Sequence, residues 1–210
     1  MNTFTLKMIA LVAMVCDHVG LIFFPEWIVF RIIGRISFPI FAYVLVEGFL
    51  YTRDIKKYLF RLGLLSLVSE IPFDLMASGR VLEFGHQNVF FTLTLGILAL
   101  WLMSRTINPI LQLIYAGAIM VVSNLLHVDY RQFGVLLIIW FYYWRSTKWV
   151  KYLGAAVIMV LLKGWTGVYT IPSLIPMLLY NEKQGPKWKW FFYIFYPVHL
   201  LVIWGISLLL

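Results

Sequence analysis

The sequence is poor in charged residues and has a single cysteine. Only 12% of its 210 residues are Asp, Glu, Lys or Arg, about half the share found in an ordinary soluble domain. Apolar residues make up 62%, and the mean hydropathy is +0.89. A soluble globule of this size has too little interior to bury so much apolar surface. The composition therefore excludes a soluble enzyme and a disordered chain, and it predicts a polytopic membrane protein.

Acidic residues are scarcer than basic ones. The chain has 9 Asp and Glu against 17 Lys and Arg, which gives a net charge of +8. In a membrane protein this excess follows from the gathering of Lys and Arg in cytoplasmic loops, so no nucleic-acid partner is predicted. Cys16 has no second cysteine with which to form a disulfide, and it does not indicate a compartment.

Several catalytic and binding motifs are also missing. The chain has no G-x-S-x-G nucleophile elbow, no H-E-x-x-H zinc motif, no P-loop and no G-x-G-x-x-G dinucleotide motif. No His is followed five residues later by Asp, which excludes the H-x-x-x-x-D signature of glycerolipid acyltransferases. The absence of a paired half-helix repeat argues against a secondary transporter. We therefore look for function among the polar residues inside the apolar segments.

Nine apolar segments, separated by short polar breaks, fill the chain. A spanning helix needs about 20 mostly apolar residues, and lipid leaves a single apolar run no alternative to a helix. The sequence thus predicts an all-α membrane bundle of about nine transmembrane segments, between eight and ten, in one domain covering residues 1–210. The sixth and seventh segments are short, and they are alternatively re-entrant or one divided span. The segments are 6–24, 27–51, 58–76, 88–104, 108–126, 132–144, 149–162, 165–180 and 190–210.

The basic residues alternate from break to break. With a cytoplasmic N-terminus, the inner side holds 12 of the 17 Lys and Arg, and the outer side holds Arg31, Arg35, Arg80, Arg131 and Lys163. This bias predicts a multi-pass protein of the inner (cytoplasmic) membrane, with the N-terminus in the cytoplasm and the C-terminus outside. No small-residue cleavage site follows the first apolar run, so this run is expected to be a retained helix.

An Asp-His pair lies within the first apolar segment. Charged groups inside a span are costly and usually face the interior of a bundle. Asp17 and His18 are about 100° apart around a helix, so they are expected to face different partners. A buried neutral imidazole is a good general base, and a nearby carboxylate can orient it. We predict His18 as a catalytic residue; the alternative is a structural polar pair that joins helices.

More charged residues lie in the second and third segments. Arg31 and Arg35 share one helical stripe, and so do Glu70 and Asp74. These four residues either pair across helices or bind a substrate, since Arg is suited to carboxylate and phosphate groups. Glu47 is a weaker substrate-binding candidate in the inner half of the second segment, where the following glycine suggests a close backbone approach.

Two predicted outer loops and the last segment complete the candidate site. His86, Gln87, Asn88 and Asp129 are candidates for substrate binding, with helix capping as the alternative for Gln87 and Asn88. The spacing of the His and Asp residues suits no zinc chelate, so no metal site is predicted. His199 is a further candidate, although a lone buried His is more often a satisfied structural group.

Six stretches of the chain resemble one known family. They are KMIALVAMVCDHVG (7–20), GRISFPIFAYVLVEGF (34–49), SEIPFDL (69–75), QNVFFTLTLGI (87–97), DYRQFGVLLI (129–138) and FYIFYPVHLL (192–201). In this order they resemble the TraX family, integral membrane proteins linked to N-terminal acetylation of conjugative pilin. The usual D-Y-G is altered here, because Arg131 replaces the glycine. The family extends far beyond conjugative plasmids, so the resemblance does not imply pilin as the acceptor.

The resemblance implies an acyltransferase. The TraX family is distantly similar to membrane acyltransferases that move an acetyl group from cytosolic acetyl-CoA to an acceptor at the outer face, with an intramembrane His. Carried to this chain, that role falls on His18 as general base or transient acyl carrier, with Asp17 as its partner. The acceptor would be an amine or hydroxyl of a peptide, such as a pilin N-terminus, or of a surface glycan. Arg35 or Asn88 would stabilise the oxyanion.

Acetyl-CoA is the predicted co-substrate and the lipid bilayer the predicted surroundings. The phosphates of acetyl-CoA are expected on the basic break after the second segment, at Arg53, Lys56, Lys57 and Arg61. The alternative is a non-enzymatic membrane protein, either a transporter or an assembly factor for a surface structure. Such a protein would use the same outer polar residues as a binding cavity.

Overall fold

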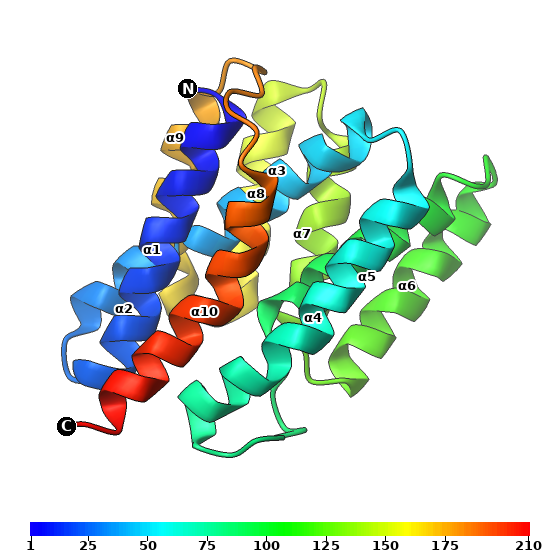
Figure 1. Cartoon of the computed structure of the whole chain (residues 1–210). Coiled ribbons are helices and arrows are strands. Elements are labelled where there is room, and N and C mark those ends of the chain that lie inside the picture. Colours follow the sequence, from blue (N-terminus) through cyan, green and yellow to red (C-terminus); the bar gives the residue numbers. More distant parts are fainter.

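The computed structural model is all-helical in the part of the chain that it describes (Figure 1). It describes the backbone of residues 1–210 and the side chains of residues 1–161 and 166–210, so the expected outer position of Lys163 lies outside the described side chains. Each predicted segment coincides with helical structure. The elements are α1 (Thr3–Phe23), α2 (Ile28–Gly34), α3 (Ser37–Tyr51), α4 (Ile55–Ser78), α5 (Val89–Met103), α6 (Pro109–Leu125), α7 (Arg131–Tyr143), α8 (Lys148–Lys163), the 3₁₀ helix η1 (Gly164–Ser173), α9 (Leu174–Leu178) and α10 (Lys189–Ser207).

Side chains in the polar breaks set the beginnings of four helices. Each accepts a hydrogen bond from a backbone N–H of the first turn, which would otherwise lack a partner. The capping role considered for Asn88 is confirmed. The caps are Asn2 on α1, Asp54 on α4, Asn88 on α5 and Asn108 on α6, with distances between 2.9 and 3.0 Å.

Among the residues that the structure describes, three stretches are long and apolar enough to cross a membrane: Thr3–Phe23, Ile28–Tyr51 and Lys189–Ser207. Shorter apolar helices are Val89–Met103, Pro109–Leu125 and Thr166–Leu178. Large apolar side chains of α6 face outward, among them Leu113, which is 73% exposed. Such a surface is expected where lipid replaces water, so the helices have the character of a membrane protein.

Two segments predicted as continuous helices are interrupted. The second is divided at Arg35 and Ile36 into α2 and α3, because Pro39 has no N–H for the carbonyl of Arg35 and its ring crowds that carbonyl. The eighth forms η1 and the short α9, with Pro172 and Pro176 inside them. Each proline again removes a donor, so the α-helical ladder cannot continue.

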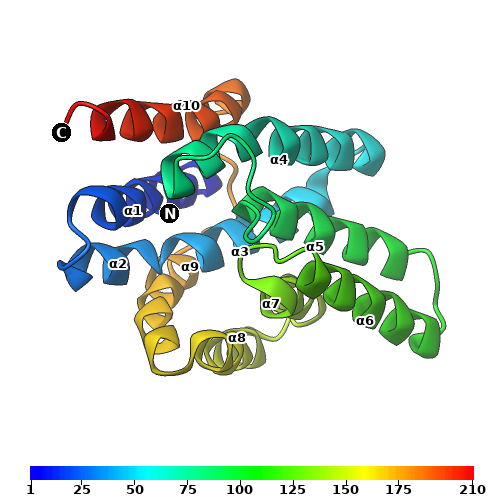
Figure 2. The same cartoon turned by 90° about the horizontal axis from the view of Figure 1, so that it is seen from below.

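The helices pack around a core between α3, α5 and α7, where Ile40, Ile97 and Leu137 are fully buried. On one side of this core α10 packs against α1 and α4 (Figure 2). On the other side α8 packs against α7 and η1. The candidate site lies on the α1–α4–α10 side, where polar residues of α1 and α10 face one another.

Candidate functional site

Two imidazole rings meet between α1 and α10. The Nδ1 atom of His18 lies 2.9 Å from Nε2 of His199, and the ring centroids are 5.1 Å apart at an interplanar angle of 18°. Nδ1 of His199 lies 2.9 Å from the carbonyl oxygen of Phe195, one turn earlier in α10. Only 8% of His199 is exposed. The lone His predicted in the last segment is therefore the partner of the predicted base.

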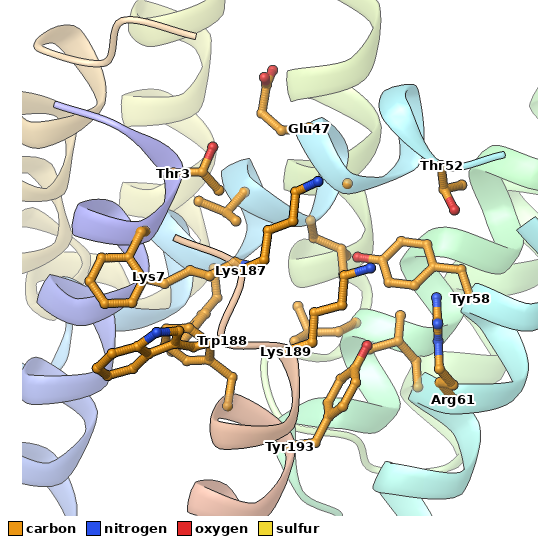
Figure 3. Close-up of a pocket in the computed structure, with 18 of the residues that line it drawn as sticks. Thr3, Lys7, Glu47, Thr52, Tyr58, Arg61, Lys187, Trp188, Lys189 and Tyr193 are labelled. Atoms are coloured by element: carbon orange, nitrogen blue, oxygen red, sulfur yellow. The ribbon is translucent and has the colours of Figure 1, made fainter. Parts of the chain in front are cut away.

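A cavity of about 830 Å³ lies between the beginnings of α1, α4 and α10 and the end of α3 (Figure 3). The acids on its wall are Glu47 and Asp54, and Asp54 is already paired with Lys57 at 3.2 Å. Like charges that converge with so few counter-charges suit a ligand with several anionic groups. We call it the basic cavity after its cationic lining, which consists of Lys7, Arg53, Lys57, Arg61, Lys187 and Lys189.

The basic cavity extends from exposed cations toward the imidazole pair. At its buried end it is lined by Met14, one turn before His18, and by Phe195 and Tyr196 of α10. The Tyr196 ring lies 6.5 Å from the ring of His18 and 5.4 Å from that of His199, measured between centroids. One layer of side chains thus separates the cavity from the imidazoles.

Glu47 lies on the wall of this cavity. Its Oε2 accepts a hydrogen bond from the Tyr180 hydroxyl at 3.1 Å. The Tyr180 hydroxyl keeps its proton at neutral pH, as an ordinary phenol does, so it donates to Glu47. The structure places Glu47 on the same cavity wall as the exposed cations, whereas the other carboxylates predicted to bind substrate lie near the loops after α4 and α6.

Asp17 has a partner on the next helix. Its Oδ2 forms an ion pair with Nη1 of Arg31 at 2.9 Å, and the same nitrogen lies 3.4 Å from the Asp17 carbonyl oxygen. Gly34 packs so closely against the Asp17 carboxylate that a Cβ at this position would collide with it. Where the resemblance implies a pairing of Asp17 with His18, the structure forms two separate pairs, Asp17 with Arg31 and His18 with His199.

Glu70 and Asp74 receive hydrogen bonds from the segment that follows α4. Both the backbone N–H and the side-chain amide of Asn88 donate to Oε2 of Glu70, at 3.1 and 2.5 Å. The Asp74 carboxylate accepts from the backbone N–H of Glu83 at 2.8 Å. The ion pair of Arg31 is therefore with Asp17 and not with either of these carboxylates. Asn88 also caps α5, so its amide serves the structure and is poorly placed to stabilise an oxyanion.

His86 and Gln87 join the loop after α4 to the loop after α6. The backbone N–H of Asp129 donates to the Gln87 carbonyl at 3.0 Å, and the Gln87 N–H donates to the carbonyl of His127 at 3.2 Å. Nε2 of His86 lies 3.6 Å from Oδ1 of Asp129. The hydroxyl of Thr92 donates to the Asp129 carbonyl. Gln87 thus acts here through its backbone, and His86 and Asp129 place their side chains together.

The loop after α6 holds residues in left-handed backbone conformations. Tyr130 has φ 62° and Arg131 has φ 43°, a region that glycine occupies without strain. The Tyr130 ring stacks on Phe38 with centroids 3.7 Å apart, and its hydroxyl oxygen accepts a hydrogen bond from the Arg35 side chain. The glycine that the resemblance implies at position 131 would adopt this conformation without strain, whereas Arg131 introduces strain there.

Replacing Arg131 by glycine is expected to stabilise the protein by about 1 kcal/mol, because glycine removes the Cβ clash of the left-handed conformation. The check is the Tm of the detergent-purified variant beside the wild type. Gln132→Gly is the matched control: it adds a glycine one position later, inside α7, and should lower the Tm. A Tm of Arg131→Gly at or below the wild-type value would contradict the inference that the backbone at Arg131 is strained.

Of the four basic residues predicted to hold phosphates, Arg53, Lys57 and Arg61 line the basic cavity, and half of its cationic lining was not predicted. Lys7 of α1, Lys187 before α10 and Lys189 at the beginning of α10 complete it. Lys56 is exposed and is not among the lining residues. The available signal was that all these residues fall on the same predicted side of the membrane, where the breaks of three helices could meet.

Comparisons with known proteins agree with the resemblance seen in the sequence. The TraX protein family model matches residues 3–207. The chain is 29% identical to the probable fimbrial assembly protein FimC, serogroup H1, of Dichelobacter nodosus, over 96% of this chain and 94% of that protein. It is 26% identical to an uncharacterized protein of Rickettsia prowazekii (strain Madrid E), over 76% of this chain and 53% of that protein. No solved structure matches. Because the family match covers nearly the whole chain, including both imidazoles and the basic cavity, the protein belongs to the TraX family.

Proposed function

We propose that this protein is an integral membrane acetyltransferase that uses cytosolic acetyl-CoA and acetylates an amine or hydroxyl at the outer face of the cytoplasmic membrane. The observation that carries the proposal is the position of the His18–His199 pair, one layer of side chains beyond the buried end of the basic cavity. A base beside a cavity suited to an anionic ligand is the arrangement that acyl transfer from a thioester requires.

The proposed topology has about nine segments in the membrane, with the N-terminus in the cytoplasm. The basic cavity then faces the cytosol, because it is lined by the breaks that carry the excess of Lys and Arg. The loops joined by Gln87 and Val128 face the outside. His18 lies between the two ends, so a donor and an acceptor approach it from opposite sides.

In this proposal the cations of the basic cavity hold the phosphates of acetyl-CoA. Exposed Lys and Arg can meet phosphate oxygens with charge-assisted hydrogen bonds. The rest of the donor runs along the apolar part of the cavity, past Leu11 and Met14 toward Phe195 and Tyr196. The side-chain layer at Phe90 and Tyr196, whose rings meet edge-on at 4.6 Å, must shift for the acetyl group to reach His18.

The proposed reaction is a single displacement with His18 as the base. Nε2 of His18 takes the proton of the acceptor N–H or O–H as the acceptor atom bonds to the acetyl carbon. The C–S bond breaks, and the leaving sulfur takes the proton from the imidazolium, which regenerates the neutral ring and releases CoA. Asn88 is committed to Glu70 and α5, so we assign the oxyanion to a guanidinium, with Arg35 as the candidate.

The acceptor would bind among the carboxylates near the loops after α4 and α6. Glu70 is 7% exposed, and its Oε1 is buried without a hydrogen-bond partner among the described side chains. Asp129 and His86 lie across the same pair of loops. A buried acceptor oxygen that lacks a donor favours a ligand with an N–H or O–H group, such as a peptide amine or a glycan hydroxyl.

The second candidate function is a membrane factor for the assembly of a surface structure, without catalysis. The name of the Dichelobacter nodosus relative, a probable fimbrial assembly protein, favours it. The two readings differ in one respect: only the enzyme needs a bound acyl donor. They are compatible if acetylation is the step that assembly requires.

The test is donor binding and turnover by the detergent-purified, full-length protein. We expect acetyl-CoA at about 100 times its Kd to raise the Tm by about 5 °C or more, and radiolabelled acetyl to appear on an amine-bearing acceptor peptide or a glycan. ATP at the same concentration is the control for general nucleotide binding. No Tm rise at saturating acetyl-CoA and no label on either acceptor would overturn the proposed acetyltransferase activity. The proposal of a non-catalytic assembly factor would then remain.

A further inference from the structure

His199 contacts His18 on one side and the backbone of its own helix on the other. The three groups form a short relay: the carbonyl oxygen of Phe195, the ring of His199 and the ring of His18, with both hydrogen-bond distances at 2.9 Å. The Phe195 ring stacks on His199 at 13° with centroids 5.1 Å apart, and Tyr196 meets it nearly edge-on at 64°. The ring of His199 is therefore fixed on its faces as well as at both nitrogens.

The direction of the protons in this relay follows from the acceptor at its end. A carbonyl oxygen only accepts, so Nδ1 of His199 must carry the proton in the bond to Phe195. A neutral imidazole has one N–H, so Nε2 of His199 is then an acceptor. Nδ1 of His18 must donate to it, and the lone pair of His18 is left on Nε2.

We infer that His199 is a positioning residue that sets the tautomer of His18, so that Nε2 is the unprotonated nitrogen of the base. The inference rests on the proposed function, because it names the atom of His18 that takes the proton of the acceptor. It also assigns His199 a role different from substrate binding. In many sites a carboxylate or a carbonyl orients the catalytic imidazole; here a second imidazole, itself held by a carbonyl, does so.

The relay holds throughout the proposed reaction without a second proton transfer. When Nε2 of His18 takes the acceptor proton, the ring becomes a cation that still donates from Nδ1 to His199. The bond is then charge-assisted and stronger, so it stabilises the imidazolium at the stage at which that ion forms. His199 remains neutral, and its own N–H remains on the Phe195 carbonyl.

Two substitutions separate positioning from packing. In His199→Gln the side-chain carbonyl oxygen lies about where Nε2 lies in the imidazole, so it can still accept from Nδ1 of His18. In His199→Leu no acceptor remains, although the volume is nearly kept. We expect kcat for acetyl transfer to fall about 100-fold or more in His199→Leu, with the acetyl-CoA KM unchanged. We expect His199→Gln to keep kcat within about tenfold of wild type.

A measurement independent of turnover reads the tautomer directly. Ring ¹⁵N chemical shifts of the labelled full-length protein in detergent should show His18 protonated at Nδ1 and unprotonated at Nε2. The preference should persist in His199→Gln and be lost in His199→Leu. The inference is overturned if wild-type His18 carries its proton on Nε2, or if His199→Leu turns over within twofold of a wild type that is itself active. A wild type with the expected tautomer but no turnover would overturn the proposed function alone.

Discussion

Replacing His18 by glutamine is expected to lower kcat for acetyl transfer by about 1,000-fold, within the range attributed to a general base. Glutamine keeps a neutral polar side chain of similar length, and its amide lies about where Nε2 of the imidazole lies, so the change is made at the nitrogen that is proposed to take the proton. Glutamine has no nitrogen that takes a proton at neutral pH. The loss is therefore expected in kcat, measured as acetyl transfer by purified protein at saturating donor.

Donor binding separates this loss from misfolding. His18 is not among the residues that line the basic cavity, so His18→Gln should show the same Tm rise with acetyl-CoA as the wild type. Cys16→Ala is the matched control: it alters α1 two residues earlier and should keep full turnover. Turnover of His18→Gln within a few-fold of wild type would refute the role of His18 as the general base. It would also refute a transient acetyl-imidazole, because that route needs the same ring nitrogen.

The sequence was sufficient to predict the helices and their order. In a bilayer an apolar run has little choice except a helix, because every backbone N–H and C=O needs a partner within the segment. The predicted segments therefore coincide with helical structure, and the polar breaks supply the caps, such as Asn88 on α5. The internal breaks at Arg35 and in η1 were missed, although Pro39, Pro172 and Pro176 were available as signals.

Side-chain partners could not be predicted in the same way. Helical spacing shows that Arg31 and Arg35 share a stripe, but not which helix that stripe faces. The resemblance implied Asp17 as the partner of His18, whereas the structure pairs Asp17 with Arg31. His18 and His199 are 181 positions apart, and only the packing of α10 beside α1 brings them together. A polar residue in a span shows that some partner is needed, and the topology decides which one.

Reversing one charge on each of two helices that line the basic cavity should have the second large effect that we expect. Arg61 belongs to α4 and Lys189 begins α10, and Figure 3 shows both side chains extending into the same cavity. Each forms a charge-assisted contact with a phosphate in the proposed complex, so Arg61→Glu with Lys189→Glu should raise the Kd of acetyl-CoA by about 100-fold. Titration calorimetry of the purified protein measures this change.

Lys56→Glu is the matched control, because it makes the same change of charge on the exposed first turn of α4 but lies outside the cavity lining. It should leave Kd within about threefold of wild type, since exposed charges at a distance are screened by salt. The wild-type Kd should also rise with ionic strength, and the double variant should lose most of that dependence, because fewer cation–phosphate contacts remain. Equal effects of the control and the double variant would mean that the cations act through the general charge of the cytoplasmic face. In that case the six cations would reflect topology alone, and the donor would have to reach His18 by a path other than the basic cavity.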